Sequence, residues 1–186
     1  SIDNCLEIAN PNQEDTDGDG IGNACDTSTS NKVPCVNGFA GVYPCNDYDL
    51  LLHLDLDVFE ASESNDSWGW TDTTTNKEYA IIGLNNGTAF VDISDTDNPV
   101  YLGKLATRTV NSSWRDMKVY NNHVFIVSEA SNHGMQVFDL TRLRDVANPP
   151  LDFTEDAHYS GFGNAHNVVI NENSGYAYGV GTSTYN

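Results

Sequence analysis

A pair of short apolar strands around a tight turn recurs along this sequence. Its copies occupy residues 78–94, 123–140 and 175–181, the third being only a beginning. In the first copy the turn contains Asn86-Gly87, and Asn-Gly is a strong signal for a β-hairpin. Val124 lies 45 positions after Tyr79, and Tyr176 lies 52 positions after Val124. The chain is therefore built from repeated β-units.

A further strand-like segment precedes each pair, at residues 67–70, 113–119 and 164–170. Units of about 40–50 residues with four strands each are typical of β-propeller blades. The apolar residues come in short runs and do not show the 3.6-residue spacing of helical repeats. We predict an all-β fold, a partial β-propeller of about three blades, with a sandwich of short strands as the alternative. Because three open blades leave an unpaired edge, we expect the protein to continue past Asn186 or its copies to assemble.

The charge of the chain narrows the classes of partner. It has 27 acidic and 8 basic side chains and a formal net charge of -19, which repels a nucleic-acid backbone. We therefore exclude nucleic acid as a partner. No apolar run approaches the roughly 18 residues of a membrane-spanning helix, so we expect no transmembrane segment in this chain. A hydrophobic content of 39% is too high for a disordered acidic tail.

The four cysteines, Cys5, Cys25, Cys35 and Cys45, all lie in the first quarter of the chain. Their even number and the lack of a Cys-x-x-Cys spacing favour two disulfides and an oxidising compartment. The segment from Cys35 to Cys45 looks like a short stretch closed by one of them. Four free thiols in a cytosolic protein are the alternative.

Residues 27–34 divide the chain, because they lack apolar periodicity and end in Pro34. Residues 1–26 contain no Lys or Arg and too few apolar side chains for a core. Cysteines and cations are the available means of holding them together. We therefore predict a small module at 1–26, a linker at 27–34 and the β domain at 35–186.

Residues 15–26 match a twelve-residue calcium loop. Alternate residues of such a loop point inward at one ion, and Gly20 permits the sharp turn. Pro11 interrupts the stretch upstream, so the flanking helices of an EF-hand are not expected. Asp3, Asn10 and Asn12 are candidates for holding a second ion. The predicted ligands of the first ion are Asp15, Asp17, Asp19, the carbonyl oxygen of Ile21, Asn23 and Asp26.

Residues 3–26 as a whole, from Asp3-Asn4-Cys5 to Ala24-Cys25-Asp26, resemble a thrombospondin type 3 repeat. The sequence departs from that pattern at Asn23, where the family more often has Asp. The resemblance implies an extracellular calcium module in which Cys5 pairs with Cys25 and closes the loop around its ligands.

The strand pairs ending in residues 89–94 and 136–140 resemble LVIVD-repeat propellers. More broadly, residues 35–186 are similar to the start of the choice-of-anchor B family of bacterial surface proteins. That resemblance implies export and attachment to the cell surface, without a firmly assigned activity. The motifs that carry it are Trp68-Gly69-Trp70-Thr71-Asp72, residues 83–88, Ser113-Trp114-Arg115-Asp116, residues 133–139 and Ala165-His166-Asn167.

Equivalent positions of successive blades lie on a ring around a propeller axis. This places Arg115 and His166 at one end of a channel, together with Trp70, Asp116 and Asn167, and within reach of Glu129 and His133. Such residues suit acid–base catalysis or a transition metal. The structural alternative is that Asp116 and Asn167 tie neighbouring strands together and that Arg115 neutralises an Asp. Trp68, Trp70 and Trp114 are either a platform for a glycan or part of the core.

Together these patterns predict a secreted or surface-displayed protein that uses its propeller for binding or adhesion. Calcium has a structural role in this prediction, and the partner is a surface protein or a glycan. The alternative is an exported propeller enzyme, a metal-dependent hydrolase or oxidoreductase, with Arg115, Asp116, His133 and His166 at its channel mouth.

Overall fold

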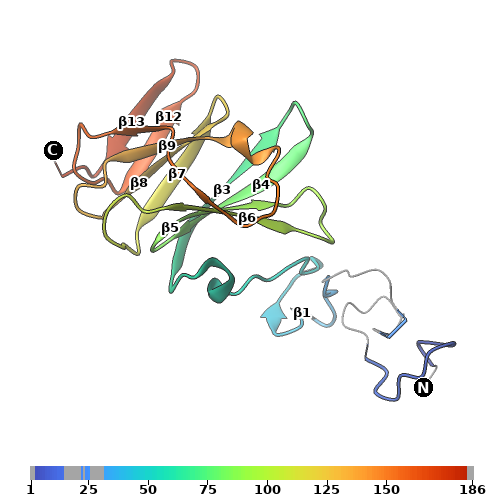
Figure 1. The fold of residues 1–186 in the computed structure, drawn as a ribbon. Coiled ribbons are helices and arrows are strands. Elements are labelled where there is room, and N and C mark those ends of the chain that lie inside the picture. Colours follow the sequence, from blue (N-terminus) through green and yellow to red (C-terminus); the bar gives the residue numbers. More distant parts are fainter. Residues whose placement is uncertain (1–2, 15–21, 23, 26–31, 184–186) are drawn as a thin grey trace. The chain divides into compact units, whose positions relative to one another are not determined.

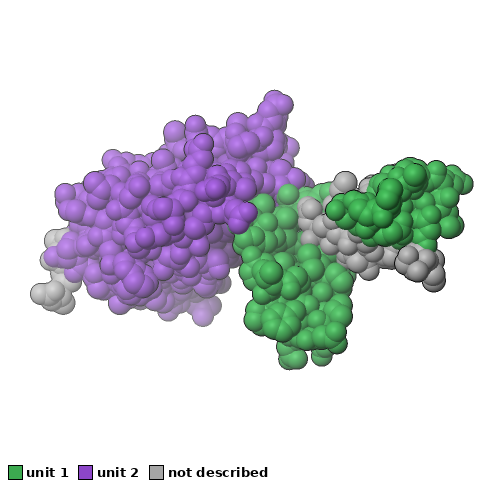
Figure 2. All heavy atoms as spheres, turned by 90° about the horizontal axis from the view of Figure 1, so that it is seen from below, with its two compact units in different colours: residues 1–54, 95–99 green, residues 55–94, 100–186 purple. Residues whose placement is uncertain are grey.

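The computed structural model describes residues 3–14, 22, 24–25 and 32–183. The chain forms two compact units, residues 1–54 with 95–99 (unit 1) and residues 55–94 with 100–186 (unit 2), coloured green and purple in Figure 2. The regular elements of the described residues are β-strands, apart from two short 3-10 helices. The predicted all-β class is confirmed. No helix in this part of the chain is long and apolar enough to cross a membrane.

Unit 1 contains little regular structure. Strand β1 (Phe39–Ala40) pairs with the antiparallel strand β2 (Tyr43–Pro44). A disulfide between Cys35 and Cys45, with Cα atoms 5.9 Å apart, closes the segment around them. The predicted bridging of this short stretch is therefore confirmed.

The described end of the predicted linker is hydrogen-bonded within unit 1. The Val33 N–H donates to the Leu50 carbonyl at 2.7 Å, and the Leu50 N–H donates back at 2.9 Å. Residues 35–54 are thus grouped with the N-terminal residues, whereas the sequence pattern predicts them at the start of the β domain. The boundaries of an independently folding domain stay a prediction.

The described residues of unit 2 form three sheets, and most of their strands are labelled in Figure 1. The strand orders are β10-β6-β5-β4-β3, β11-β9-β8-β7 and β12-β13. Neighbouring strands are antiparallel except β10 and β6, which are parallel. The bounds are η1 Leu56–Phe59, β3 Ser64–Asp72, β4 Lys77–Leu84, β5 Gly87–Asp92, β6 Val100–Ala106, β7 Arg115–Tyr120, β8 His123–Ser128, β9 Met135–Asp139, η2 Leu140–Leu143, β10 Leu151–Phe153, β11 Ala157–Tyr159, β12 Asn167–Asn171 and β13 Tyr176–Val180.

The predicted strand pairs are strands of unit 2. In the first hairpin, β4 pairs with β5 around Asn85-Asn86, with Ile81 opposite Phe90. The later copies are β8 with β9, and β13. The strand predicted before each pair is also present, as β3, β7 and β12. These first strands adjoin one another, β3 beside β7 and β7 beside β12. The described part of unit 2 therefore contains a four-stranded antiparallel sheet, β3 to β6, that β10 extends in parallel, a second four-stranded antiparallel sheet and a two-stranded antiparallel sheet.

The main core lies between the first two sheets. The rings of Phe90 on β5 and Phe138 on β9 stack with centroids 4.8 Å apart, which joins the two sheets directly. Burying one side chain of this size stabilises the fold by about 1.5–3 kcal/mol. The buried members are Trp70, Tyr79, Ile81, Phe90, Leu102, Leu105, Met117, Val124, Ile126, Phe138, Leu140, Leu143 and Phe153.

One glycine permits the parallel pairing of β10 with β6. Gly103 has a φ of 140°, a conformation that residues with side chains rarely adopt. It lies opposite Leu151, and a Cβ atom at Gly103 would overlap the Leu151 carbonyl oxygen. Only glycine allows the two backbones this approach.

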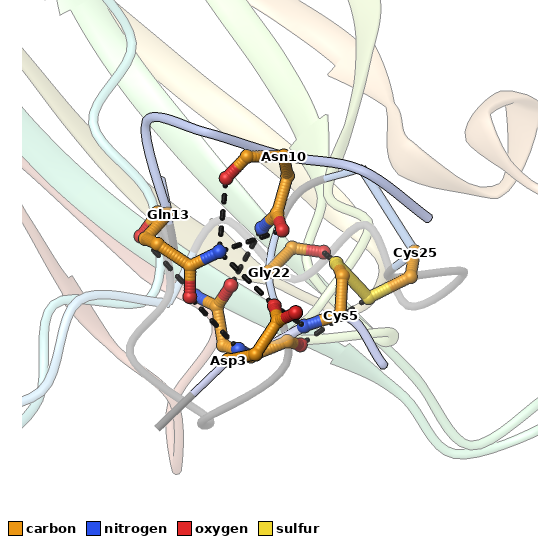
Figure 3. Close-up of a disulfide and its surroundings, with 7 residues drawn as sticks. Asp3, Cys5, Asn10, Gln13, Gly22 and Cys25 are labelled. Atoms are coloured by element: carbon orange, nitrogen blue, oxygen red, sulfur yellow. Dashed lines mark hydrogen bonds between the residues drawn. A yellow bond between two sulfur atoms is a disulfide. The ribbon is translucent and has the colours of Figure 1, made fainter. Parts of the chain in front are cut away.

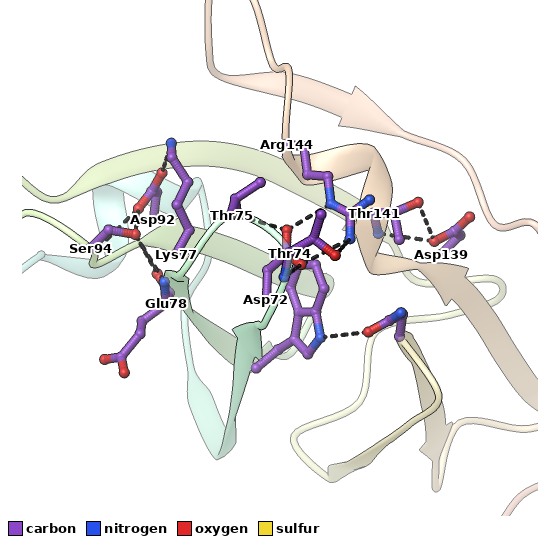
Figure 4. Close-up of polar contacts among 12 residues, drawn as sticks. Asp72, Thr74, Thr75, Lys77, Glu78, Asp92, Ser94, Asp139, Thr141 and Arg144 are labelled. Carbon is purple, nitrogen blue, oxygen red and sulfur yellow. Dashed lines mark hydrogen bonds and ion pairs between the residues drawn. The ribbon is translucent and has the colours of Figure 1, made fainter.

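An ion pair joins the end of β3 to the segment that follows η2 (Figure 4). Arg144 donates from Nε to Asp72 Oδ2 at 2.6 Å and from Nη2 to Oδ1 at 2.8 Å. This bidentate contact with Arg144 holds the pKa of Asp72 well below its usual range. Asp139 positions η2 by accepting a hydrogen bond from the Thr141 N–H at 2.9 Å. The ion pair between Arg144 and Asp72 therefore connects the first sheet to the segment that follows the second sheet's strand β9 and η2.

Candidate functional site

The predicted calcium ligands lie outside the described residues, but the residues around them are described. Cys5 and Cys25 form a disulfide with Cα atoms 5.6 Å apart, as the resemblance to thrombospondin type 3 repeats implied (Figure 3). Cys5 is buried, while Leu6 is 88% exposed. This module is thus closed covalently, and its described apolar side chains do not form a core.

Amide side chains hold the rest of this module together (Figure 3). Gln13 Nε2 donates to Asp3 Oδ1 at 3.0 Å and to Asn10 Oδ1 at 2.7 Å. Asn10 Nδ2 in turn donates to Asn4 Oδ1 at 2.6 Å, and the Gly22 N–H donates to the Asn4 carbonyl at 2.8 Å. The network therefore joins the residues before the predicted loop to Gly22 within it.

Asp3 and Asn10, two candidates for a second ion, use side-chain oxygens in this network. The Asp3 carboxylate accepts from the Cys5 N–H at 3.1 Å and from Gln13, and these two bonds lower its pKa. Asp3 is thereby kept ionised. Among the described residues no group of three or more His, Cys, Asp or Glu side chains is arranged to hold a metal ion.

In unit 2, the structure brings together two of the predicted channel residues, Arg115 and His133. Arg115, at the start of β7, is 2% exposed, and His133, in the loop between β8 and β9, is fully buried. Arg115 Nη1 lies 3.1 Å from His133 Nε2, and Arg115 Nε donates to the Leu84 carbonyl at 3.0 Å. The expected neutralisation of an Asp by Arg115 is not found among the described residues, because the Arg115 side chain contacts a backbone carbonyl and an imidazole.

The hydrogen bonds of His133 define its tautomer. Its Nδ1 lies 3.1 Å from the Gly134 carbonyl oxygen, which only accepts, so Nδ1 carries the proton. Nε2 therefore accepts from Arg115. Burial lowers the pKa of His133 to about 4, and burial lowers the pKa of Arg115 to about 10. At neutral pH the pair is a neutral imidazole and a buried cation.

His158 belongs to the same cluster. Its Nε2 donates to the His133 carbonyl oxygen at 2.8 Å. Gly134, at φ 64°, leaves room for this contact, since a Cβ atom there would lie 2.7 Å from His158 Nε2. His158 therefore supports the loop that carries His133.

Asp116 ties neighbouring strands together, which is the structural alternative predicted for it. Its Oδ2 accepts a hydrogen bond from the Val168 N–H at 2.6 Å, which joins β7 to β12. Its Oδ1 accepts from Lys118 Nζ, also at 2.6 Å. Burial opposes ionisation of Asp116, but hydrogen bonds from Asp66, Lys118 and Val168 outweigh it and lower the pKa. Burial raises the pKa of Asp66, and the neighbouring Asp116 adds to this effect.

His166 lies apart from the buried pair. Its Nδ1 is 2.5 Å from Glu129 Oε1, and both side chains are substantially exposed, at 50% and 39%. The Trp114 ring lies 5.9 Å from the His166 ring and is itself 52% exposed. We call these three residues the Trp114 cluster. Glu129 is a predicted member of the site, whereas no local signal in the sequence associates Trp114 with it.

Trp70, another residue predicted at the channel, does not lie beside Arg115. Trp70 is buried, stacks on Tyr79 with centroids 5.0 Å apart, and donates from Nε1 to Asn122 Oδ1 at 3.3 Å. It lies towards the end of β3, whereas Asn65, near the start of β3, is the residue that contacts Arg115. The prediction that Trp70 converges with Arg115 is therefore wrong, because the two residues are at opposite ends of neighbouring strands.

The tryptophans thus separate into core and surface. Trp70 belongs to the core, while Trp68 is 43% exposed with Lys118 Nζ 4.4 Å from its ring centroid. Trp114 is the exposed tryptophan that lies beside the hydrogen-bonded pair of Glu129 and His166. Chemically, the Trp114 cluster offers an apolar ring face, a carboxylate and an imidazole at one place on the surface.

Comparisons of the chain with models of known protein families, with curated proteins and with solved structures found no match. The two resemblances drawn from the sequence motifs stay predictions.

Proposed function

We propose that this chain is a secreted or cell-surface protein in which a calcium-binding module precedes a β-propeller used for binding or adhesion. Export is supported by the two disulfides, Cys5–Cys25 and Cys35–Cys45, because such bonds persist in oxidising compartments. All four cysteines are paired. A folded chain with a net charge of -19 suits a partner other than nucleic acid.

A propeller of about three blades in this chain is supported by the repetition of the sheets. The first strands of the three sheets, which are the inner strands of the proposed blades, adjoin one another, β3 with β7 and β7 with β12. We call the hydrogen bond between the first strands of neighbouring sheets the joint, and it also repeats. Asn65 Oδ1 accepts from the Arg115 N–H at 3.0 Å, and Asp116 Oδ2 accepts from the Val168 N–H at 2.6 Å. Equivalent contacts between successive sheets are expected of radial repeats.

The calcium proposal rests on the residues of the loop, supported by its surroundings. Three Asp residues at alternate positions repel one another unless a cation lies between them. The Cys5–Cys25 disulfide and the hydrogen bond from the Gly22 N–H to the Asn4 carbonyl join described residues of the loop to the segment before it. Calcium then orders a segment that lacks a core, with an affinity of about 10⁻⁴–10⁻³ M by analogy with extracellular modules.

The observation that carries the binding function is the exposed Trp114 ring next to the hydrogen-bonded Glu129 and His166. Sugars present apolar C–H faces and hydroxyl groups, which an aromatic face with adjacent polar groups matches. With a carboxylate in the cluster and a strongly acidic chain, a neutral or basic glycan is favoured over a sialylated or sulfated one.

A glycan microarray tests this function, with the fluorescently labelled full chain in calcium. We expect binding to neutral glycans that Trp114→Ala weakens at least about tenfold, a loss of about 1.4 kcal/mol. Trp68→Ala is the matched control, because Trp68 is similarly exposed but lies over Lys118. Equal binding by both variants, or binding to proteins of a cell extract but to no glycan, would contradict a glycan site at Trp114.

An exported enzyme is the second candidate, favoured by the short hydrogen bond between His166 Nδ1 and Glu129 Oε1. A carboxylate in that position orients an imidazole as a general base. Of the four predicted catalytic residues, Arg115 and His133 are buried and Asp116 is occupied in the joint, so His166 is the one suited to substrate. Hydrolysis of p-nitrophenyl esters with added divalent metals, lost in a stably folded His166→Ala variant, would support the enzyme over the binding protein.

A further inference from the structure

Arg115 is a buried cation without a carboxylate partner. It is 2% exposed, and no described acidic side chain forms an ion pair with it. Its contacts through Nε and Nη1 go to the neutral Leu84 carbonyl and the neutral His133 imidazole. Burying an uncompensated charge costs several kcal/mol, even in a relaxed protein interior. A chain with 27 acidic side chains nevertheless places none of the described ones here.

The third guanidinium nitrogen, Nη2, has no hydrogen-bond partner among the described residues, although it is buried. Its two N–H groups are the strongest unpaired donors in this part of the core. The hydroxyl of Thr88, a residue that is 1% exposed, is also buried without a partner. Arg115 Nη2 and the Thr88 hydroxyl are therefore two buried donor atoms without partners among the described residues.

The strand geometry places Arg115 and Thr88 in one layer. Arg115 lies two positions before the core residue Met117 on β7, and Thr88 lies two positions before the core residue Phe90 on β5. Since strand side chains alternate, both point towards the core between the two sheets. Thr88 is also opposite Gly83 and hence adjacent to Leu84, the residue whose carbonyl binds Arg115. The layer forms the polar end of the core.

We propose that this layer binds a small monovalent anion of halide size, held by Arg115 Nη2 and the Thr88 hydroxyl. A water molecule would satisfy a donor but would leave the guanidinium charge uncompensated. Sulfate and phosphate carry more charge and are larger than a site between two packed sheets admits. The neutral tautomer of His133 cannot compensate the charge either, because its Nε2 lone pair is used by Arg115 Nη1.

The bound anion fixes the starts of β5 and β7 and, through Arg115, the loop that carries His133. It therefore stabilises the joint between the first two sheets. Gln136, two positions before Phe138 on β9, completes the polar layer by donating from Nε2 to the Ala106 carbonyl at 3.1 Å. Its Oε1 is a buried acceptor without a hydrogen-bond partner among the described residues.

Thermal unfolding of the full chain in calcium gluconate tests the proposal. Sodium bromide replaces sodium gluconate from 0 to about 50 mM at constant ionic strength. A specific site predicts that the unfolding midpoint rises with bromide and then saturates, as expected for a ligand that binds the folded state. General salt effects are held constant and do not saturate in this range. Equal midpoints in bromide and gluconate would overturn the proposal.

Two variants and one control test whether the bromide response comes from Arg115 and Thr88. Arg115→Met removes the charge but retains much of the volume, a replacement that folded proteins often tolerate, and it should abolish the bromide response. Thr88→Val keeps the shape and should raise the bromide concentration at half-saturation at least about fivefold. Arg108→Met changes an arginine that is 42% exposed and should leave the response intact. If Arg115→Met does not fold, an unchanged half-saturation in Thr88→Val, or a bromide response lost in Arg108→Met, would still refute the site.

Discussion

The carboxylate of Asp116 accepts a 2.6 Å hydrogen bond from the backbone N–H of Val168, 52 positions later in the chain. The same kind of bond joins Asn65 to the Arg115 N–H across 50 positions. Each bond connects the first strand of one sheet to the first strand of the next. The sequence repeat is therefore accompanied by a repeated joint, in which one side chain per sheet satisfies a backbone donor of its neighbour.

Asp116→Ala should destabilise unit 2 by about 2–3 kcal/mol, because it leaves the buried Val168 N–H without its acceptor and Lys118 without its closest carboxylate. Asp116→Asn, which keeps an acceptor oxygen but loses the charge, should lie between Asp116→Ala and the unchanged protein. Urea unfolding followed by fluorescence measures both. Asp152→Ala, at an exposed position, should change stability by less than about 0.5 kcal/mol. An equally small effect of Asp116→Ala would contradict the joint.

His133 should make the fold sensitive to mild acid. Its pKa is about 4 in the folded protein and about 6.5 when unfolded. Between these values the unfolded chain binds a proton that the folded one does not, so stability is complete above pH 6.5 and falls as pH decreases towards 4. The full loss is on the order of 3 kcal/mol. His133→Gln should flatten the dependence of the unfolding free energy between pH 7 and 5. A slope that is unchanged in this variant would show that other groups cause it.

Gly103→Ala should destabilise the first sheet by about 2–4 kcal/mol, since the new Cβ atom overlaps the Leu151 carbonyl and the backbone is in the left-handed half of conformational space. Gly69→Ala is the matched control, because a Cβ atom there meets its nearest neighbour, the Tyr79 carbonyl oxygen, at an ordinary 3.9 Å. Differential scanning calorimetry compares the two. Similar unfolding temperatures for both variants would contradict the tight approach of β6 and β10.

The strands were predictable where the sequence contains local signals. The Asn86-Gly87 turn and the alternation around Tyr79 and Ile81 are properties of neighbouring residues, and β4 and β5 lie where they predict. Strand β10 was not predicted. It has three residues and pairs in parallel with β6, which depends on the conformation of Gly103 rather than on its own sequence.

For the candidate sites, the sequence predicts which residues take part but not which of them are in contact or buried. The contact between Arg115 and His133 joins a strand to a loop 18 positions away, and its burial follows from packing between sheets. Spacing on a ring suggested that Trp70 would join Arg115, but Trp70 is five residues beyond Asn65, which contacts Arg115. The exposure of Trp114 could not be read from its sequence, since Trp70 occurs in a similar context and is buried.

Asp17→Ala should remove calcium protection of the N-terminal module, because it deletes a central carboxylate of the predicted loop. Limited proteolysis followed by mass spectrometry measures the cleavage rate within residues 1–26. Calcium should slow this cleavage at least about tenfold in the unchanged chain and not in the variant. Asp152→Ala should keep the protection. Protection that survives Asp17→Ala would place any bound calcium elsewhere.

A native mass spectrum of the full chain, before and after chelation, tests the central proposal most directly. We predict a mass lower than that of the fully reduced chain by the four hydrogens lost in two disulfides. In calcium buffer at least one bound calcium ion should add to this mass, and chelation should remove it. A chain that carries no calcium at millimolar concentration would contradict the calcium-binding module.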